Sequence, residues 1–286
     1  EELPILKELT DTYLLGWESV KEMSTGLLPD ATHQNTRSVD AKAAPAKIVW
    51  RKDELVDKLK AKGFEGQKMK SAMHYLKYID THADLAVANQ RQYGIFASIQ
   101  LAQALLESNA GRSKLARNTN NHFGIKARLS KNARRKINAQ QHERLVDSDF
   151  IVSAPAIAVF NMTDDHAYDR FEKYATVEDS YFRHTQLLTR SCQMGKVGCY
   201  SWIWTTYKAG ATCDLSEQAA KYYYRTQLNA TDFFGQPSVP YFAAAAAGLK
   251  MAGYATSKTY HKKLAYIIET YDLWKFDMAE EATLIY

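Results

Sequence analysis

One glutamate stands where the sequence pattern of a buried helix ends. The run from Leu101 to Leu106 repeats apolar residues at helical spacing, Glu107 follows it, and residues 108–111 supply a helix stop. The dipole at a helix C-terminus disfavours an anion, and the neighbouring leucines shield the carboxyl from water, so both effects predict a raised pKa. An acid that stays protonated is suited to general acid catalysis. The alternative is an exposed helix-end glutamate without a chemical role.

Three short segments around and after this glutamate carry a family resemblance. AQALLESNAG around Glu107, NNHFGIK at residues 120–126 and GYAT at residues 253–256 resemble signatures of the glycoside hydrolase family 73 N-acetylglucosaminidases, which are peptidoglycan hydrolases. The resemblance covers residues 77–277. It implies a mainly α (α+β) fold, in which a lysozyme-like helical domain carries a small β-hairpin lobe flanking the cleft, plus a helical N-terminal extension.

The resemblance also implies the reaction, hydrolysis of the β-1,4 bond after N-acetylglucosamine by an endo-β-N-acetylglucosaminidase. Glycosidic cleavage needs an acid to protonate the leaving oxygen and negative charge on the other side of the sugar. Glu107 fits the acid role. In relatives the second acidic residue lies at the end of a hairpin strand, which corresponds here to Asp165 or Asp164, with Asp169 and Glu143 as weaker candidates. Aspartate in place of the commoner glutamate shortens the reach by one methylene.

A second route uses the substrate itself, because the oxygen of its N-acetyl group can act as the nucleophile. Tyr254 would then lie near the anomeric carbon and the hairpin carboxylate would only support it. The resemblance further implies substrate contacts at four positions: Asn121, Phe123, Tyr174 and Tyr260. Ser257 stands where relatives carry aspartate. No metal and no other cofactor is implied.

Other functions remain open at this stage. A muramidase cuts the neighbouring linkage with the same acid chemistry. A non-catalytic wall-binding or virion structural protein would keep the fold without turnover, and the departures at Ser257 and in the hairpin favour it. A nucleic-acid binder would use the basic stretch at residues 127–141, but that stretch has no interleaved aromatics and no recognisable motif. We expect this stretch to be a solvated loop.

Composition sets the wider limits. The 286 residues are 46% hydrophobic with a formal net charge of +5 and a pI near 8.9, which suits one or two soluble domains acting on an anionic polymer. No run of residues is apolar and long enough for a membrane span, and the first residues lack the pattern of a signal peptide. We expect peptidoglycan strands as the partner, and work in the periplasm, in the cell wall or outside the cell, or in a phage virion.

The remaining patterns predict the elements that position these residues. Residues 1–70 form a helical extension and linker that could bind a protein partner, with a short helix at 48–65 ended by Gly63. Residues 71–286 form the glucosaminidase domain, with a helix from Tyr78 to about Gln92, a turn at 93–94 and then the Glu107 helix. A hairpin follows around residues 151–176, and residues 189–239 look like an insertion.

All three cysteines lie in that insertion. Cys192, Cys199 and Cys213 have no histidine among them and no C-x-x-C spacing, so a zinc site is poorly supported. We expect one disulfide, with a Cys192–Cys199 bridge closing a small loop, and one free thiol; three free thiols remain the alternative for a reducing compartment. The clustered aromatics of the insertion favour a core role over stacking on sugars.

Overall fold

The computed structural model describes residues 49–162, 164 and 166–278, so residues 1–48 of the predicted helical extension and linker lie outside the described residues. Within the described part the chain is mainly helical with three two-stranded antiparallel sheets, which confirms the mainly α (α+β) prediction. The helices are α3 Lys52–Ala61, α4 Gly66–Tyr93, α5 Ala97–Ser108, α6 Lys114–Thr119, α7 Lys131–Asn138, α8 Val177–Thr189, α9 Ser201–Thr206, α10 Ser216–Thr226, α11 Ala230–Phe234, α12 Tyr241–Met251, α13 Tyr260–Thr270 and α14 Trp274–Asp277. The strands are β1 Arg128–Leu129, β2 Phe150–Ile151, β3 Ala158–Asn161, β4 Arg170–Lys173, β5 Thr212–Asp214 and β6 Ser238–Pro240.

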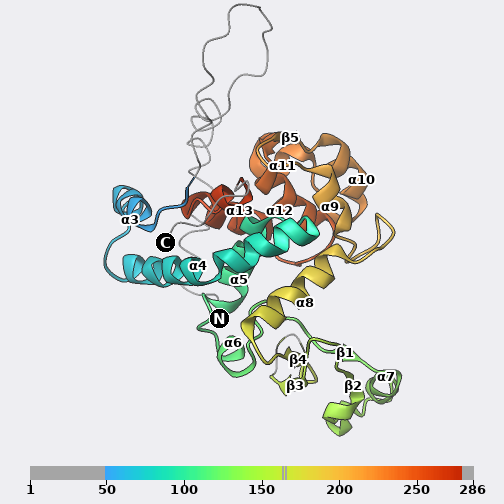
Figure 1. Ribbon diagram of the computed structural model, residues 1–286. Helices are drawn as coiled ribbons and strands as arrows, with labels where there is room; N and C mark the ends of the chain where they lie inside the picture. Colours follow the sequence, from blue (N-terminus) through green and yellow to red (C-terminus); the bar gives the residue numbers. More distant parts are fainter. Residues whose placement is uncertain (1–48, 163, 165, 279–286) are drawn as a thin grey trace, which may run out of the picture.

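Helix α5 lies at the centre of the core. Its residues from Ala97 to Leu105 are all buried, and it packs against α4, α12, α13 and α14 (Figure 1). Its N-terminus is held by a carboxylate from the far end of the chain, since Asp277 Oδ1 accepts from the backbone N–H of Ser98 at 2.8 Å. Tyr241 donates its hydroxyl to the other oxygen of Asp277 at 2.7 Å. A buried helix with a fixed N-terminus fixes the position of its last turn, which carries Glu107.

Helix α12 owes its close packing to small residues. Alanine fills positions 243–247, and a Cβ at Gly248 would come within 3.0 Å of the Ile203 side chain on α9. Short side chains let helices approach closely without leaving voids. Helix α12 is therefore held against α13, α5 and α9 at once.

The predicted boundary at residue 70 falls inside a helix. Helix α4 begins at Gly66 and ends at Tyr93, before Gly94 in the left-handed conformation, as the Tyr-Gly turn predicts. Helix α3 confirms the short helix predicted before Gly63 and packs on the same core through Leu55 and Leu59. The described part of the expected extension thus shares the core of the helical domain.

The hairpin forms where it was expected, with β3 and β4 paired over four residue pairs from Ala158 with Lys173 to Asn161 with Arg170. Figure 1 shows it near the end of α8, in a lobe with β1, β2 and α7. The basic stretch is not the predicted loop, because residues 131–138 form α7. Ser130 caps this helix by accepting from the N–H of Ala133, and Ala133 packs in a small separate apolar cluster.

The segment predicted as an insertion packs as part of the helical core. Trp202, Tyr207 and Tyr222 are buried, and the rings of Trp202 and Tyr222 stack with centroids 5.3 Å apart, which confirms a core role for these aromatics. Cys192 and Cys199 form the predicted disulfide and Cys213 is free. Among the described residues no helix combines the length and apolar character that crossing a membrane requires.

Candidate active site

Glu107 occupies the last turn of α5, where the chain leaves the core. The helix ends in three consecutive left-handed residues, Asn109 to Gly111, and the first of these is a residue type that tolerates this conformation. The Ser108 hydroxyl fixes the turn by donating to the Ala104 carbonyl at 2.6 Å and accepting from the Gly111 N–H at 2.7 Å. The preceding Leu105 is buried, whereas Glu107 is exposed to solvent. The LESNAG segment thus points a carboxyl out of a buried helix.

A tyrosine hydroxyl connects Glu107 to the rest of its helix. Tyr260 begins α13 and donates its hydroxyl to Glu107 Oε1 at 3.0 Å. The same hydroxyl accepts from Gln103 Nε2 at 3.0 Å. Gln103 precedes Glu107 by one helical turn, so both side chains lie on the same face of α5. The carboxyl therefore has a fixed neutral donor on one oxygen.

Tyr254 is placed next to Tyr260 by the way α12 ends. Gly253 is left-handed with φ of +83°, its N–H binds the Lys250 carbonyl, and the N–H of Tyr254 binds the Leu249 carbonyl at 3.0 Å. These two bonds define a Schellman motif, which requires a residue such as glycine at this position. The ring of Tyr254 stacks on that of Tyr260 with centroids 5.5 Å apart. The GYAT segment is thus a helix stop that positions a tyrosine.

His184 joins Tyr254 to Phe123. Its Nε2 lies 3.3 Å from the Tyr254 hydroxyl, and its ring stacks on Phe123 with centroids 3.9 Å apart. Burial lowers the pKa of His184 to about 3, so the imidazole is neutral near neutral pH. Phe123, predicted as a substrate contact, is buried here and supports Tyr254 through the histidine.

The surroundings raise the pKa of Glu107. Desolvation by nearby protein atoms is the largest cause, and the negative charge of Asp164 adds to it, while the hydrogen bond from Tyr260 acts in the opposite direction. The carboxyl is thus partly desolvated although the side chain still reaches solvent. A carboxylic acid with a raised pKa and access to a ligand can donate a proton near neutral pH.

Asp164 lies in the turn of the β3–β4 hairpin and is exposed. Lys126 Nζ pairs with Asp164 Oδ2 at 2.8 Å and with Asp169 Oδ2 at 3.0 Å, so one lysine connects both carboxylates. Asp165 lies outside the described residues. Glu143 is exposed in the turn after α7, where its Oε1 lies 3.8 Å from Nε of the neighbouring Arg144.

The other two predicted contact residues are buried at the base of the hairpin. Asn121 accepts from the N–H of Ile125 at 3.0 Å and donates to the Glu172 carbonyl at 2.8 Å. Tyr174 donates its hydroxyl to Glu172 Oε2 at 2.6 Å, and Arg183 binds both oxygens of Glu172 at 2.9 and 3.0 Å. This network joins the NNHFGIK turn, strand β4 and helix α8, which places the hairpin relative to the helices.

The family follows from comparison with known proteins. A family model described as mannosyl-glycoprotein endo-beta-N-acetylglucosaminidase matches residues 83–273, about two thirds of the 286-residue chain. The chain belongs to this glucosaminidase family. The match covers Glu107, the hairpin and the α12–α13 turn, and also the segment at residues 189–239.

The chain has a curated relative in the exo-glucosaminidase LytG of Bacillus subtilis (strain 168), with 27% identity over 200 residues. That alignment covers 70% of this chain and 52% of the relative, so the chain spans about half the length of the curated relative it matches. Among solved structures, the catalytic domain of the autolysin Auto from Listeria monocytogenes has a TM-score of 0.40 at 21% identity, covering 71% of this chain and 87% of that one. An N-acetylmuramoyl-L-alanine amidase from Staphylococcus aureus has a TM-score of 0.42 at 23% identity, covering 73% of this chain and 44% of that one.

Three residues of this candidate site were missed in the sequence analysis. Gln103 holds Tyr260, His184 joins Phe123 to Tyr254, and Glu172 organises the hairpin base. Gln103 had a readable signal, since it is a polar residue one turn before Glu107 in a mostly apolar helix. The pairing of Glu172 with Arg183 and the contacts of His184 with Phe123 and Tyr254 join separate elements, so no local pattern indicates them.

Proposed function

We propose that this chain hydrolyses the β-1,4 bond that follows N-acetylglucosamine in the glycan strands of peptidoglycan, with Glu107 as the general acid. The proposal rests on one observation, the environment of Glu107. Its side chain reaches solvent, desolvation by nearby protein atoms raises its pKa, and the hydrogen bond from Tyr260 fixes the orientation of its carboxyl. Membership of the glucosaminidase family and the net positive charge support it, because peptidoglycan carries acidic stem peptides.

In this proposal Glu107 protonates the leaving glycosidic oxygen as positive charge develops on the sugar. Asp164 or Asp165 supplies negative charge from the hairpin, either to activate water or to support attack by the substrate's acetamide oxygen. Tyr254 orients the reacting sugar in the acetamide route. Phe123, Asn121 and Tyr174 act indirectly: Phe123 supports Tyr254 through His184, and the other two hold the hairpin.

We propose internal cleavage of the strands, although the curated relative is named as an exo-enzyme. The disulfide between Cys192 and Cys199 supports a place of work outside the cytoplasm, in the periplasm, in the cell wall or in a virion.

Measuring the length of the glycan strands during digestion tests both the hydrolysis and its endo mode. Purified peptidoglycan treated with the protein should gain reducing ends while its mean strand length falls early in the reaction. Release of small fragments while the remaining strands keep their length would replace the endo mode with an exo mode. A protein that binds the wall and forms no reducing ends would be a non-catalytic wall-binding protein, and the proposed function would be wrong.

A further inference from the structure

The segment between α8 and α9 has no regular secondary structure and carries apolar side chains on its outside. Residues 194–198 form turns and a bend, and Met194 and Val197 are 44% and 69% exposed. The disulfide closes the part of this segment from Cys192 to Cys199, called here the disulfide loop. Turn hydrogen bonds within the loop and the burial of Cys199 fix part of its position. Contacts with other elements fix the exposed tip.

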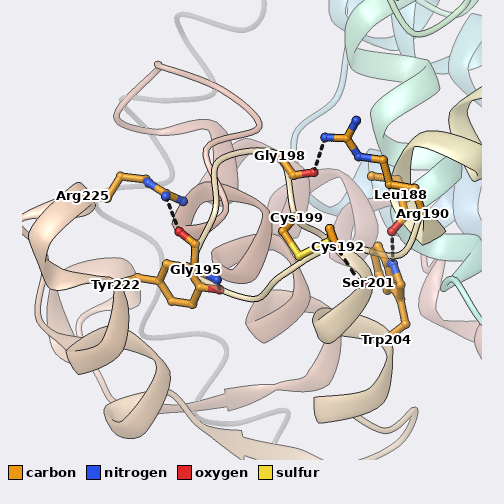
Figure 2. Close-up of a disulfide and its surroundings, with 10 residues drawn as sticks. All are labelled: Leu188, Arg190, Cys192, Gly195, Gly198, Cys199, Ser201, Trp204, Tyr222 and Arg225. Carbon is orange, nitrogen blue, oxygen red and sulfur yellow. Dashed lines mark hydrogen bonds between the residues drawn. A yellow bond between two sulfur atoms is a disulfide. The ribbon is translucent and has the colours of Figure 1, made fainter.

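One set of contacts ties the loop to the end of α10. The Gly195 carbonyl accepts from Arg225 Nη2 at 2.7 Å and from the Tyr224 hydroxyl at 2.6 Å. The Gly195 N–H donates to the Tyr222 hydroxyl at 3.2 Å. Figure 2 shows Arg225 and Tyr222 converging on Gly195 at the tip of the loop, on the opposite side from the Arg190 contact with Gly198. Both peptide groups of the tip are therefore satisfied by α10.

A second set of contacts ties the loop to the end of α12. The Gly198 N–H donates to the Ala252 carbonyl at 2.9 Å. A Cβ at Gly253 would lie 3.3 Å from Val197 Cγ1, so the loop lies directly against this glycine. Arg225 contributes to both sets, because its Nη1 donates to the Met251 carbonyl at 2.9 Å. One guanidinium thus joins the loop tip and the last turn of α12.

The end of α12 is the Schellman turn that places Tyr254. The loop and Arg225 bind the carbonyls of Met251 and Ala252 and pack on Gly253, which are the three residues before Tyr254. Tyr200, the residue after Cys199, packs its ring on that of Tyr254 with centroids 5.5 Å apart. The contacts therefore lead from the disulfide to Tyr254, then by ring stacking to Tyr260, and by a hydrogen bond to Glu107.

We propose that the disulfide loop, Arg225 and Tyr200 are positioning elements of the active site, which hold Tyr254 and Tyr260 in the geometry that Glu107 requires. The inference rests on the proposed function for its effect on activity. It assigns a catalytic consequence to a disulfide that would otherwise serve stability alone. Arginine suits this role because its planar fork can donate to two carbonyls in fixed directions, whereas a lysine ammonium is a point charge on a flexible chain.

The test compares variants that keep the fold but release the turn. Cys192→Ser with Cys199→Ser opens the loop, Arg225→Ala removes both carbonyl contacts, and Tyr200→Ala removes the ring. Their controls are Cys213→Ser, which leaves the disulfide intact, Arg225→Lys, which keeps the charge, and Tyr200→Phe, which keeps the ring. Each variant is assayed below its melting temperature for kcat, KM and the pH dependence of kcat/KM.

We expect kcat to fall by about 10- to 100-fold in the releasing variants, because small displacements at a reacting centre have effects of this size. KM should change less, the alkaline limb of the pH profile should move, and Tyr200→Phe and Cys213→Ser should behave as the wild type. Combining Arg225→Ala with the open loop should cost little more than either alone, since both act on the same turn.

Hydrogen exchange gives a readout that does not depend on catalysis. The amide of Tyr254, bonded to the Leu249 carbonyl, should lose protection in the open-loop and Arg225→Ala variants but not in Cys213→Ser. A lower melting temperature with unchanged kcat, pH profile and Tyr254 protection would overturn the inference and leave the loop a role in stability only. An inactive wild-type protein would overturn the proposed function, and the exchange result alone would then decide whether the loop holds the turn.

Discussion

Two regions reach Glu107, and they are held in different ways. The α12–α13 turn brings Tyr254 and Tyr260, and Lys250 Nζ holds this turn by donating to the carbonyls of Ala255, Thr256 and Ser257 at 2.9–3.2 Å. Stacked rings and a left-handed glycine complete it. The hairpin brings Asp164, which is exposed and whose partner is the Lys126 ammonium.

The difference separates fixed from adjustable parts of the site. Lys250 donates to neutral backbone carbonyls, and the groups that contact Glu107 and Tyr254 in this turn are hydroxyls and packed rings. Such neutral groups keep their geometry over a wide range of salt and pH, because they carry little charge that salt can screen or protons can titrate. Exposed ion pairs contribute little energy and are screened by salt. We infer that Glu107, the proposed acid, is positioned before substrate binds, whereas the proposed hairpin carboxylate takes its final position with the substrate.

The largest expected effect is on the acid itself. Glu107→Gln keeps the shape of the side chain and an oxygen for Tyr260 but removes the proton donor. The rate of hydrolysis should fall by about 10²–10⁴-fold with little change in melting temperature. Glu217→Gln is the matched control, because Glu217 is an exposed carboxylate on α10. A Glu107→Gln protein with more than about a tenth of wild-type turnover contradicts the assignment.

The next largest expected effect is on stability, at the base of the hairpin. Glu172→Gln leaves the mostly buried Arg183 without its carboxylate and should cost about 3–5 kcal/mol of unfolding free energy, on the order of 10 °C in melting temperature. Glu217→Gln breaks an exposed pair with Lys221 and should cost at most about 1 kcal/mol. Thermal unfolding measures both, and equal losses would show that the Glu172 network is not what holds the hairpin.

The losses of kcat in variants of Tyr254 and of the hairpin aspartates should identify the nucleophile. If the substrate acetamide attacks, Tyr254→Phe should lower kcat more than Asp164→Asn or Asp165→Asn. If a carboxylate activates water, one of the aspartate variants should lose nearly as much activity as Glu107→Gln. We expect the acetamide order, because aspartate reaches less far than the glutamate of relatives. Full activity in Tyr254→Phe beside an inactive aspartate variant would reverse that order.

The smallest predicted effect is a shift in the pH dependence of kcat/KM. Its direction should differ between a variant of the α12–α13 turn and a variant of the hairpin. A general acid must be protonated, so kcat/KM falls as the pH rises through the pKa of Glu107. Removing the Tyr260 hydroxyl with Tyr260→Phe takes away a bond that favours the carboxylate, so the pKa rises and the alkaline limb moves to higher pH. Asp164→Asn removes a neighbouring negative charge, so the pKa of Glu107 falls and the limb moves to lower pH. If the alkaline limbs of both variants moved in the same direction, a group other than Glu107 would control the pH dependence.

The helices could be predicted from sequence because their signals are local. The apolar spacing before Glu107 predicted α5, and the Tyr93-Gly94 pair predicted the end of α4. The β-branched and small apolar residues before a turn-like segment predicted the hairpin around residues 151–176. The disulfide could also be proposed, since Cys192 and Cys199 are close in the sequence. These features depend on residues within one or two turns of each other.

Contacts between distant segments could not be predicted in the same way. The Asp277 carboxylate on the N-terminus of α5, the Arg225 bridge and the stacking of His184 on Phe123 join residues that no local pattern relates. The residues before α3 also contact a distant segment, because the indole N–H of Trp50 donates to the Tyr271 carbonyl at 2.8 Å. The basic stretch became a helix because Ser130 caps it and Lys136 pairs with the buried Asp149 at 2.6 Å.

The identity of the new reducing-end sugar tests the central claim most directly. Purified peptidoglycan is digested with the wild-type protein and with Glu107→Gln, the products are reduced with borohydride, and the fragments are identified by mass spectrometry. The account predicts reduced N-acetylglucosamine at the new ends with the wild type and a loss of these fragments with Glu107→Gln. Reduced N-acetylmuramic acid at the new ends, or equal release by both proteins, would contradict it.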